Sequence, residues 1–212
     1  MVDDPAPDAP AAPTAVRRLR AAAHPLRLRM LSLLTGAELS AAEVARALGT
    51  THANASYHLR VLLEAGEVVV AGEEVVRGGV AKRYRHPWRE RAELEQAGPP
   101  ADPAELRGYV RAMAEELVRR YDARAPHTSG TVTAETAETA ETAETAETDR
   151  GTLTDAEVWV DPATWSRALD LLREAGALLH DGARPPGTPG TRHVALTLGA
   201  FAMAPPTDED RG

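Results

Sequence analysis

Apolar residues between positions 40 and 66 recur at the spacing of two short helices separated by a turn. Each helix has one apolar stripe, formed by Val44, Ala47 and Leu48 in the first and by Ala55, Leu59 and Leu62 in the second. Residues three, four or seven positions apart lie on one face of a helix. We therefore expect two amphipathic helices that pack against a common core.

Residues at the helix ends strengthen this prediction. Ser40 and Glu43 form a capping-box pattern, in which each side chain satisfies a free backbone N–H at the helix start. Gly49 is suited to the left-handed conformation that often ends a helix, Thr51 is a favourable N-cap, and Gly66 ends the second helix. A helix, a short glycine-containing turn and a second helix form a helix-turn-helix, whose second helix enters the DNA major groove.

The β-branched residues after Gly66 predict a hairpin. Valines at 68–70 and 75–76 favour an outgoing strand, Gly78-Gly79 favours a turn, and residues 80–85 form the returning strand. Basic residues lie at the tip and on the returning strand: Arg77, Lys82, Arg83 and Arg85. A basic hairpin directly behind a helix-turn-helix is typical of a wing that lies along the DNA backbone or minor groove.

The second helix, residues 52–64, turns a polar face outward when its apolar stripe is buried. Asparagine can pair with adenine and alanine can contact a thymine methyl group, while reading residues lie near the helix N-terminus. A solvated face is an equally good interpretation of this helix alone, and the wing decides between the two. The predicted base-selecting residues are His52, Ala53, Asn54 and Tyr57. The complete set of candidate DNA-binding residues is Thr51, His52, Ala53, Asn54, Ser56, Tyr57, Arg60, Arg77, Lys82 and Arg83.

At these residues the chain resembles the ArsR-type family of bacterial winged-helix transcriptional regulators. The resemblance is carried by AAHPLRLRMLSLL, LSAAEVARALGTTHANASYHLRVLLEAGEVVV and VRGGVAKRYR. It implies a homodimer that binds a near-palindromic operator in double-stranded DNA. Many family members sense metals or arsenicals through cysteine thiolates, whereas this chain has no cysteine.

Further helices flank the predicted winged helix. Residues 14–23 favour one helix, and His24-Pro25 begins the next, since proline suits the first helical turn. A third helix extends from Pro103 to about residue 123, with apolar residues at Leu106, Tyr109, Val110, Met113, Leu117 and Tyr121. This helix is too apolar on one side to stand alone. It packs on the chain's own C-terminal part or pairs across a dimer axis, and both arrangements remain open.

Residues 152–204 predict a small α+β unit. Val158 and Val160 alternate with acidic residues as in a short strand, and residues 193–201 alternate in the same way. Between these strands a helix begins at Asp161-Pro162 and carries Trp165, Ala168, Leu169, Leu172 and Leu179 on one face. The unit is interpreted as a dimerisation or effector unit, in which Trp159 and Trp165 line a ligand pocket or, more commonly, a plain core.

The remaining segments have no apolar periodicity. The N-terminus is acidic and rich in proline and alanine, and a three-residue TAE repeat occupies residues 133–148. The predicted division is a disordered tail (1–13), a DNA-binding domain (14–91), a connecting or dimerisation helix (102–125), an acidic linker (126–151), the C-terminal unit (152–204) and a second disordered tail (205–212).

Charge is divided unevenly between these segments. The chain carries a net charge of −8, but residues 14–91 hold 13 Arg or Lys against 7 Asp or Glu and are therefore net +6, which leaves −14 elsewhere. A basic module with acidic appendages is the electrostatic footprint of a nucleic-acid-binding domain.

Several classes of function have no signal in the sequence. No apolar run reaches the length of about 18 residues needed for a membrane span, and the N-terminus lacks the pattern of a signal peptide. We therefore expect a cytoplasmic protein with no membrane partner. No P-loop, GxGxxG or GxSxG motif occurs, nor any HxH or HxxxH pair. We therefore expect no enzymatic activity, no metal site and no cofactor.

The sequence predicts an α+β protein, with a mainly helical winged helix-turn-helix domain and a small C-terminal α+β unit. The predicted function is that of a homodimeric transcriptional regulator, which reads double-stranded DNA with the helix at 52–64 and the basic wing at 77–85. One alternative is a winged-helix protein-interaction module. Another is a ligand-responsive regulator with a small-molecule effector site in the C-terminal unit.

Overall fold

The computed structural model describes residues 15–76, 79–90, 92, 103–124 and 152–203. The predicted tails, the predicted acidic linker and Arg77 at the predicted hairpin tip lie outside these residues.

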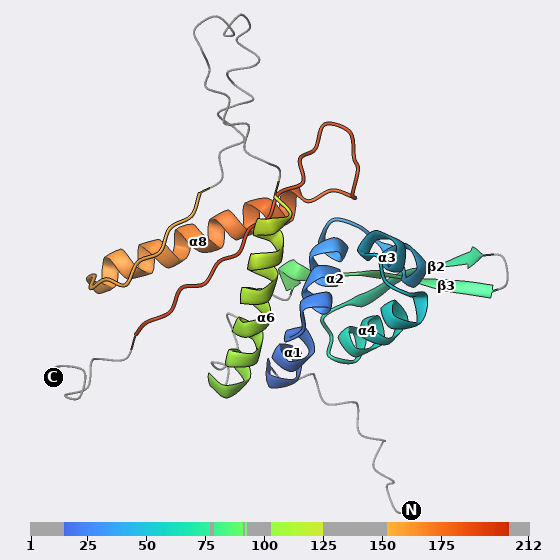
Figure 1. Cartoon of the computed structure of the whole chain (residues 1–212), viewed down its shortest axis with the longest axis horizontal. Helices are drawn as coiled ribbons and strands as arrows, with labels where there is room; N and C mark the ends of the chain where they lie inside the picture. Colours follow the sequence, from blue (N-terminus) through green and yellow to red (C-terminus); the bar gives the residue numbers. More distant parts are fainter. Residues whose placement is uncertain (1–14, 77–78, 91, 93–102, 125–151, 204–212) are drawn as a thin grey trace, which may run out of the picture.

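The N-terminal part of the chain folds as a winged helix (Figure 1). Its elements are α1 (Ala15–Ala22), α2 (Pro25–Thr35), β1 (Leu39–Ser40), α3 (Ala41–Leu48), α4 (His52–Glu64), β2 (Val69–Val76) and β3 (Gly79–Arg85). The three strands form an antiparallel sheet in the order β1-β3-β2. The predicted α+β class, with a mainly helical winged helix, is confirmed.

Short-range interactions set the ends of α3 and α4 where the sequence predicted them. The backbone N–H and the hydroxyl of Ser40 both donate to Glu43 Oε2 at 2.8 Å, and Glu43 N donates back to Ser40 Oγ at 3.4 Å. Gly49 adopts the left-handed conformation with φ of 64°. Thr51 Oγ1 accepts a hydrogen bond from Asn54 N at 3.2 Å and caps α4.

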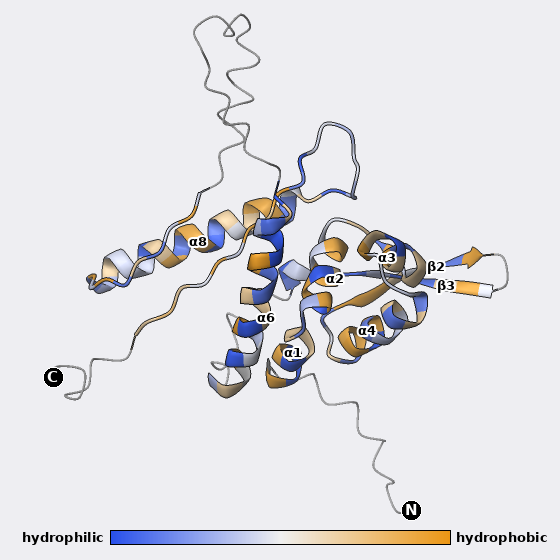
Figure 2. Ribbon diagram, in the orientation of Figure 1, coloured by the Kyte–Doolittle hydropathy of each residue, from blue (hydrophilic) through white to orange (hydrophobic). Residues whose placement is uncertain are grey.

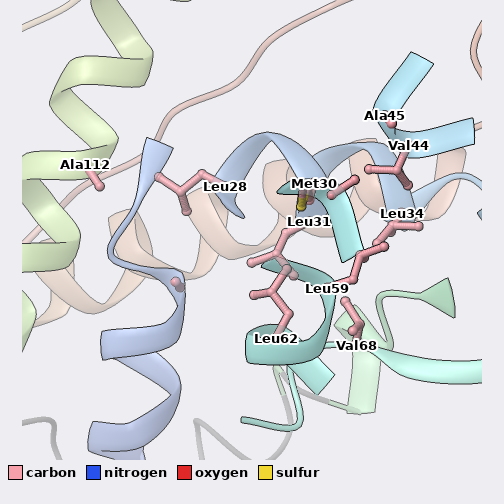
Figure 3. Close-up of a cluster of buried hydrophobic side chains, with 12 residues drawn as sticks. Leu28, Met30, Leu31, Leu34, Val44, Ala45, Leu59, Leu62, Val68 and Ala112 are labelled. Carbon is pink, nitrogen blue, oxygen red and sulfur yellow. The ribbon is translucent and has the colours of Figure 1, made fainter. Parts of the chain in front are cut away.

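The apolar side of α4 meets α2 and α3 in one core (Figure 3). Ala55, Leu59 and Leu62, the predicted stripe of α4, are completely buried. The largest apolar side chains buried with them are Met30, Leu34, Val44 and Val68. These contacts fix the rotation of α4 and so determine which of its residues face outward.

One position of the predicted α3 stripe is wrong. Ala47 is exposed, whereas Ala45 is buried beside Val44. Helix α3 packs not only on α2 and α4 but also against β1 and β3. Its buried face is therefore rotated toward the sheet.

Strand β1 was not predicted from the sequence. Leu39 pairs with Tyr84 and Ser40 pairs with Arg83, so the loop before α3 joins the edge of the wing. A strand of two residues has no alternation to read, and its partner lies far along the chain. Tertiary contact alone creates this element.

Helix α6 (Pro103–Asp122) lies across α1 and α2 and covers them with part of its apolar face (Figure 1). Ala112 is buried near Leu28 of α2 (Figure 3), and Tyr109 and Met113 pack against the same core. The neighbouring stripe of apolar side chains is exposed and consists of Leu106, Val110, Leu117 and Tyr121. The covered part of the face therefore packs on the winged helix.

The C-terminal unit contains the predicted helix, α8 (Pro162–Gly182), but the predicted strands are wrong. Asp161 Oδ1 caps α8 by accepting hydrogen bonds from Ala163 N and Thr164 N, both at 3.0 Å. Residues 152–160 and 191–203 are assigned to no strand. A strand requires a hydrogen-bonded neighbour as well as alternating side chains, and neither segment pairs with another part of the described chain.

The C-terminal end of α8 is docked beside the end of β3. The rings of Trp88 and His180 stack with centroids 5.0 Å apart, and Arg89 Nη2 lies 2.5 Å from Asp181 Oδ1. Gly36 packs so closely that a Cβ there would lie 2.8 Å from the carbonyl oxygen of Arg184. The C-terminal unit is thus attached at the base of the wing.

Candidate DNA-binding surface

Helix α4 presents a polar outer face because its opposite face is locked into the core. Thr51, His52, Ala53 and Arg60 are exposed, and Tyr57 retains 52% of its accessible surface. Asn54 and Ser56 are half-buried at the edge of this face. The structure therefore brings the predicted residues of α4 together on one surface of the molecule.

The amide of Asn54 is held in place at the start of α4. Its Nδ2 donates a hydrogen bond to Thr50 Oγ1 at 2.8 Å, while its backbone N–H is used by the Thr51 cap. This bond occupies one of the two amide N–H groups, so the side chain can still donate once and accept through its oxygen. These are the groups that pair with an adenine edge.

A groove of about 450 Å³ separates α4 from the returning strand of the wing. The residues that line it are Ala53, Ser56, Tyr57, Arg60, Leu63 and Glu64 from α4 with Lys82 and Tyr84 from β3. The Arg60 guanidinium lies 5.9 Å from the centre of the Tyr57 ring. Two cations, a hydroxyl and two phenols along one groove suit a phosphate backbone.

Arg83 does not point freely toward solvent. Its Nη1 lies 2.7 Å from Glu74 Oε2 on β2 and 3.3 Å from Glu43 Oε2 on α3, and its Nη2 donates to the carbonyl of Glu38. Hydrogen bonds from the backbone and hydroxyl of Ser40, and next the charge of Arg83, lower the pKa of Glu43. Arg83 thus joins the wing to the capping box of α3.

His58 was not singled out in the sequence and is buried under the outer face of α4. Its ring centroid lies 4.8 Å from that of His24, which caps α2 by accepting a hydrogen bond from Leu26 N at 3.1 Å. The spacing from Ala55 and Leu62 places residue 58 on the apolar stripe. That periodicity could have revealed its burial.

A second hollow, of about 500 Å³, lies at the junction between the winged helix and the C-terminal unit. Residues 34–38 and 85–90 line most of this hollow, and Pro185 is the lining residue from the C-terminal unit. Trp159, a candidate pocket residue in the sequence, is 86% exposed. Neither Trp159 nor Trp165 lines this hollow.

Comparison with known families agrees with this geometry. Residues 22–69 match a family described as a helix-turn-helix domain. The match extends from the end of α1 to the start of β2 and includes both helices of the predicted motif. No curated protein matches the chain. The helix-turn-helix domain identifies a DNA-binding regulator as the class of protein.

No helix in the described part of the chain has the length and apolar character needed to cross a membrane.

Proposed function

We propose that the protein is a sequence-specific transcriptional regulator of the ArsR type. The observation that carries this proposal is the polar face of α4, held outward by three completely buried residues and bordered by the groove along β3. A recognition helix beside a basic wing can read bases and contact phosphates at the same time.

Residue roles follow from position on this surface. His52, Ala53 and Asn54 occupy the first turn of α4, where recognition helices contact base edges, and Tyr57 follows one turn later. Arg60 and Lys82 face the groove and contact phosphates, supported by the Ser56 hydroxyl. Thr51 orients the helix as its cap. Arg83 acts as a positioning residue that holds the wing, rather than as one of the DNA-binding residues predicted from the sequence.

A homodimer is part of the proposal because one winged helix covers too few base pairs for selective binding among many competing sites. Two copies related by a two-fold axis place their recognition helices roughly 34 Å apart, in successive major grooves of a near-palindromic operator. The exposed apolar stripe of α6 is a surface that could form the contact between the two copies.

Enzymatic activity is not part of the proposal, because a DNA-reading surface accounts for the polar groups of α4 and β3. A winged helix that binds another protein is the rival function. The centre of such a surface is depleted of lysine, whereas Lys82 lines the groove beside α4.

The first prediction concerns base reading. Selection of duplexes from a random library should yield a near-palindromic operator, and fluorescence anisotropy then measures affinity for it. Asn54→Ala should cost about 1–3 kcal/mol at one base pair and relax specificity there. Arg173→Ala, an exposed change on α8, is the control and should bind like the parent. A selection that enriches no sequence contradicts the proposed function.

A further inference from the structure

Helix α4 carries hydrophilic and hydrophobic residues side by side (Figure 2), and one of the hydrophilic residues faces inward. His58 is only 7% exposed, and its buried Nδ1 has no hydrogen-bond partner among the described residues. Buried polar groups are nearly always hydrogen-bonded, so an exception calls for a reason. The proposed base and phosphate contacts come from the outer face of α4 and give this ring no role.

The ring of His58 touches both a proposed base reader and the cap of another helix. The Tyr57 ring meets it edge-on, with centroids 5.1 Å apart and an angle of 76° between the planes. The His24 ring lies 4.8 Å away at an angle of 45°. Tyr57 also lines the groove between α4 and β3. The direction of this reader therefore depends on where the His58 ring lies.

The cap of α2 requires that Nδ1 of His24 carry no proton. This atom accepts a hydrogen bond from Leu26 N at 3.1 Å, and a protonated ring nitrogen can only donate. The N-terminal end of a helix also disfavours a positive charge. A proton on His24 would thus remove the cap of α2, a helix that packs against α4.

A positive charge on His58 is opposed by its surroundings. Burial, and next the charges of His24 and Arg27, lower the pKa of His58. Arg27 is fixed in place because its guanidinium donates hydrogen bonds to the carbonyls of Ala21 and Arg20. None of the described carboxylates raises the pKa of His58.

The nearest opposing carboxylate acts on His24 instead. Burial and then Arg27 lower the pKa of His24 by more than a backbone hydrogen bond and then Glu115 of α6 raise it. A proton that enters this cluster therefore leaves a buried positive charge without a counter-ion at His58.

Ionisable groups on the other helices that pack against α4 have partners of their own. On α1, Arg18 lies 3.9 Å from Glu67. On α3, Glu43 is bound by Arg83 at 3.3 Å.

We propose that His58 is a positioning residue for DNA reading: with His24 it holds the Tyr57 ring on the outer face of α4, and a proton on this pair moves that ring and weakens operator binding. A buried cation without a partner is relieved when its ring turns toward water, and Tyr57, which packs against the ring, moves with it. This inference rests on the proposed function and adds a dependence on pH to it.

An exposed histidine on the same helix should have the opposite effect. His52 lies at the start of α4 and is exposed. Its proton would add a positive charge near the phosphates and so strengthen binding in acid. The sign of the pH dependence therefore separates the buried pair from the exposed ring.

Operator affinity of the full-length chain tests the proposal, measured by fluorescence anisotropy between about pH 7.5 and about pH 5.5 at constant ionic strength. The parent should lose at least tenfold in affinity. His58→Gln, whose amide is neutral throughout, should lose less than threefold. His193→Gln, a change at an exposed histidine of the C-terminal unit, is the matched control and should lose as much as the parent. Circular dichroism at each pH measures the folded fraction.

Nuclear magnetic resonance of the parent tests the same role without a variant. The ring signals of Tyr57 should shift with the same midpoint as those of His58. This measurement decides the matter if His58→Gln does not fold.

Three results overturn the positioning role: a parent-like loss of affinity in His58→Gln, a loss in the parent that only follows the folded fraction, and Tyr57 signals that do not follow His58. With any of them, specific binding by the parent at neutral pH leaves the proposed function intact. A parent chain that binds no specific DNA at neutral pH overturns the proposed function itself.

Discussion

His58 sits one residue from the reading face of α4, but its ring is buried against His24. Burial lowers the pKa of His58, and the charges of His24 and Arg27 lower it further. Burial and then Arg27 also lower the pKa of His24, against smaller opposing effects of a backbone hydrogen bond and then of the Glu115 charge. Nδ1 of His58 has no hydrogen-bond partner among the described residues. The folded protein therefore holds these two rings in their neutral forms beneath the recognition helix.

This pair predicts a loss of stability in mild acid. The ordinary pKa of histidine is 6.5, so the unfolded chain gains protons below that pH while the folded rings resist them. The free energy of unfolding should fall as the pH decreases from 7 toward 5. Denaturant titrations at each pH measure this change, and His58→Gln should flatten it. His52→Gln, at an exposed site of the same helix, is the control. An unchanged slope in His58→Gln contradicts the prediction.

At the level of elements, the wing is joined to the helix-turn-helix through side chains as well as through the sheet. Arg83 of β3 contacts Glu43 of α3, Glu74 of β2 and the carbonyl of Glu38 just before β1. Lys82, its neighbour in sequence, is exposed and faces the groove beside α4. Lys82 and Arg83 thus make different contacts, since successive side chains of a strand point to opposite faces of the sheet.

The salt dependence of DNA binding should distinguish a phosphate contact by Lys82 from the positioning role of Arg83. Lys82→Ala should weaken binding to all duplexes and reduce the salt slope by about 1, because one phosphate contact is lost. Arg83→Met should lower the free energy of unfolding by about 1 kcal/mol, a modest value because the ion pairs are partly exposed. Its salt slope should remain that of the parent. A slope reduced as much as in Lys82→Ala would instead make Arg83 a phosphate contact.

For the whole molecule, α6 connects folding of the winged helix to assembly. One side of α6 carries Ala112 and Glu116 into the contact with α1 and α2, and the Arg119 and Arg120 side chains pair with the buried Glu116 carboxylate. Hydrogen bonding to Glu116 raises the pKa of Arg119. The next stripe of the same helix is apolar and exposed. One face of α6 can therefore pack on its own winged helix while the adjacent face contacts a second copy.

A charge introduced on the exposed stripe should therefore weaken the dimer. Leu117→Glu is expected to raise the dimer dissociation constant at least tenfold in sedimentation or light-scattering measurements, because the carboxylate would be buried at the interface. Operator affinity should fall with it. Val118→Glu changes an exposed residue of similar size on another side of α6. This variant should have the same dimer dissociation constant as the parent. Equal behaviour of the two variants would exclude this stripe from the interface.

The helix-turn-helix could be predicted in detail because its determinants are local. The capping box of Ser40 and Glu43, the left-handed turn at Gly49 and the stripe at Ala55, Leu59 and Leu62 depend on residues a few positions apart. The polar face of α4 follows directly from that stripe. The position of the candidate residues on the outer side of α4 could therefore be predicted before any long-range contact was known.

Features that depend on distant contacts were decided only by the tertiary structure. The sequence predicts that Arg83 lies on the wing. Its partners on α3 and before β1 come close to it only when the sheet forms. The alternating residues after α8 predicted a strand, yet alternation describes side chains and cannot supply a hydrogen-bonded neighbour. The sequence alone determined the local helices, their caps and their polar faces, because these depend on neighbouring residues. Strand pairing and the partners of Arg83 required the folded chain, because each depends on residues far apart in sequence.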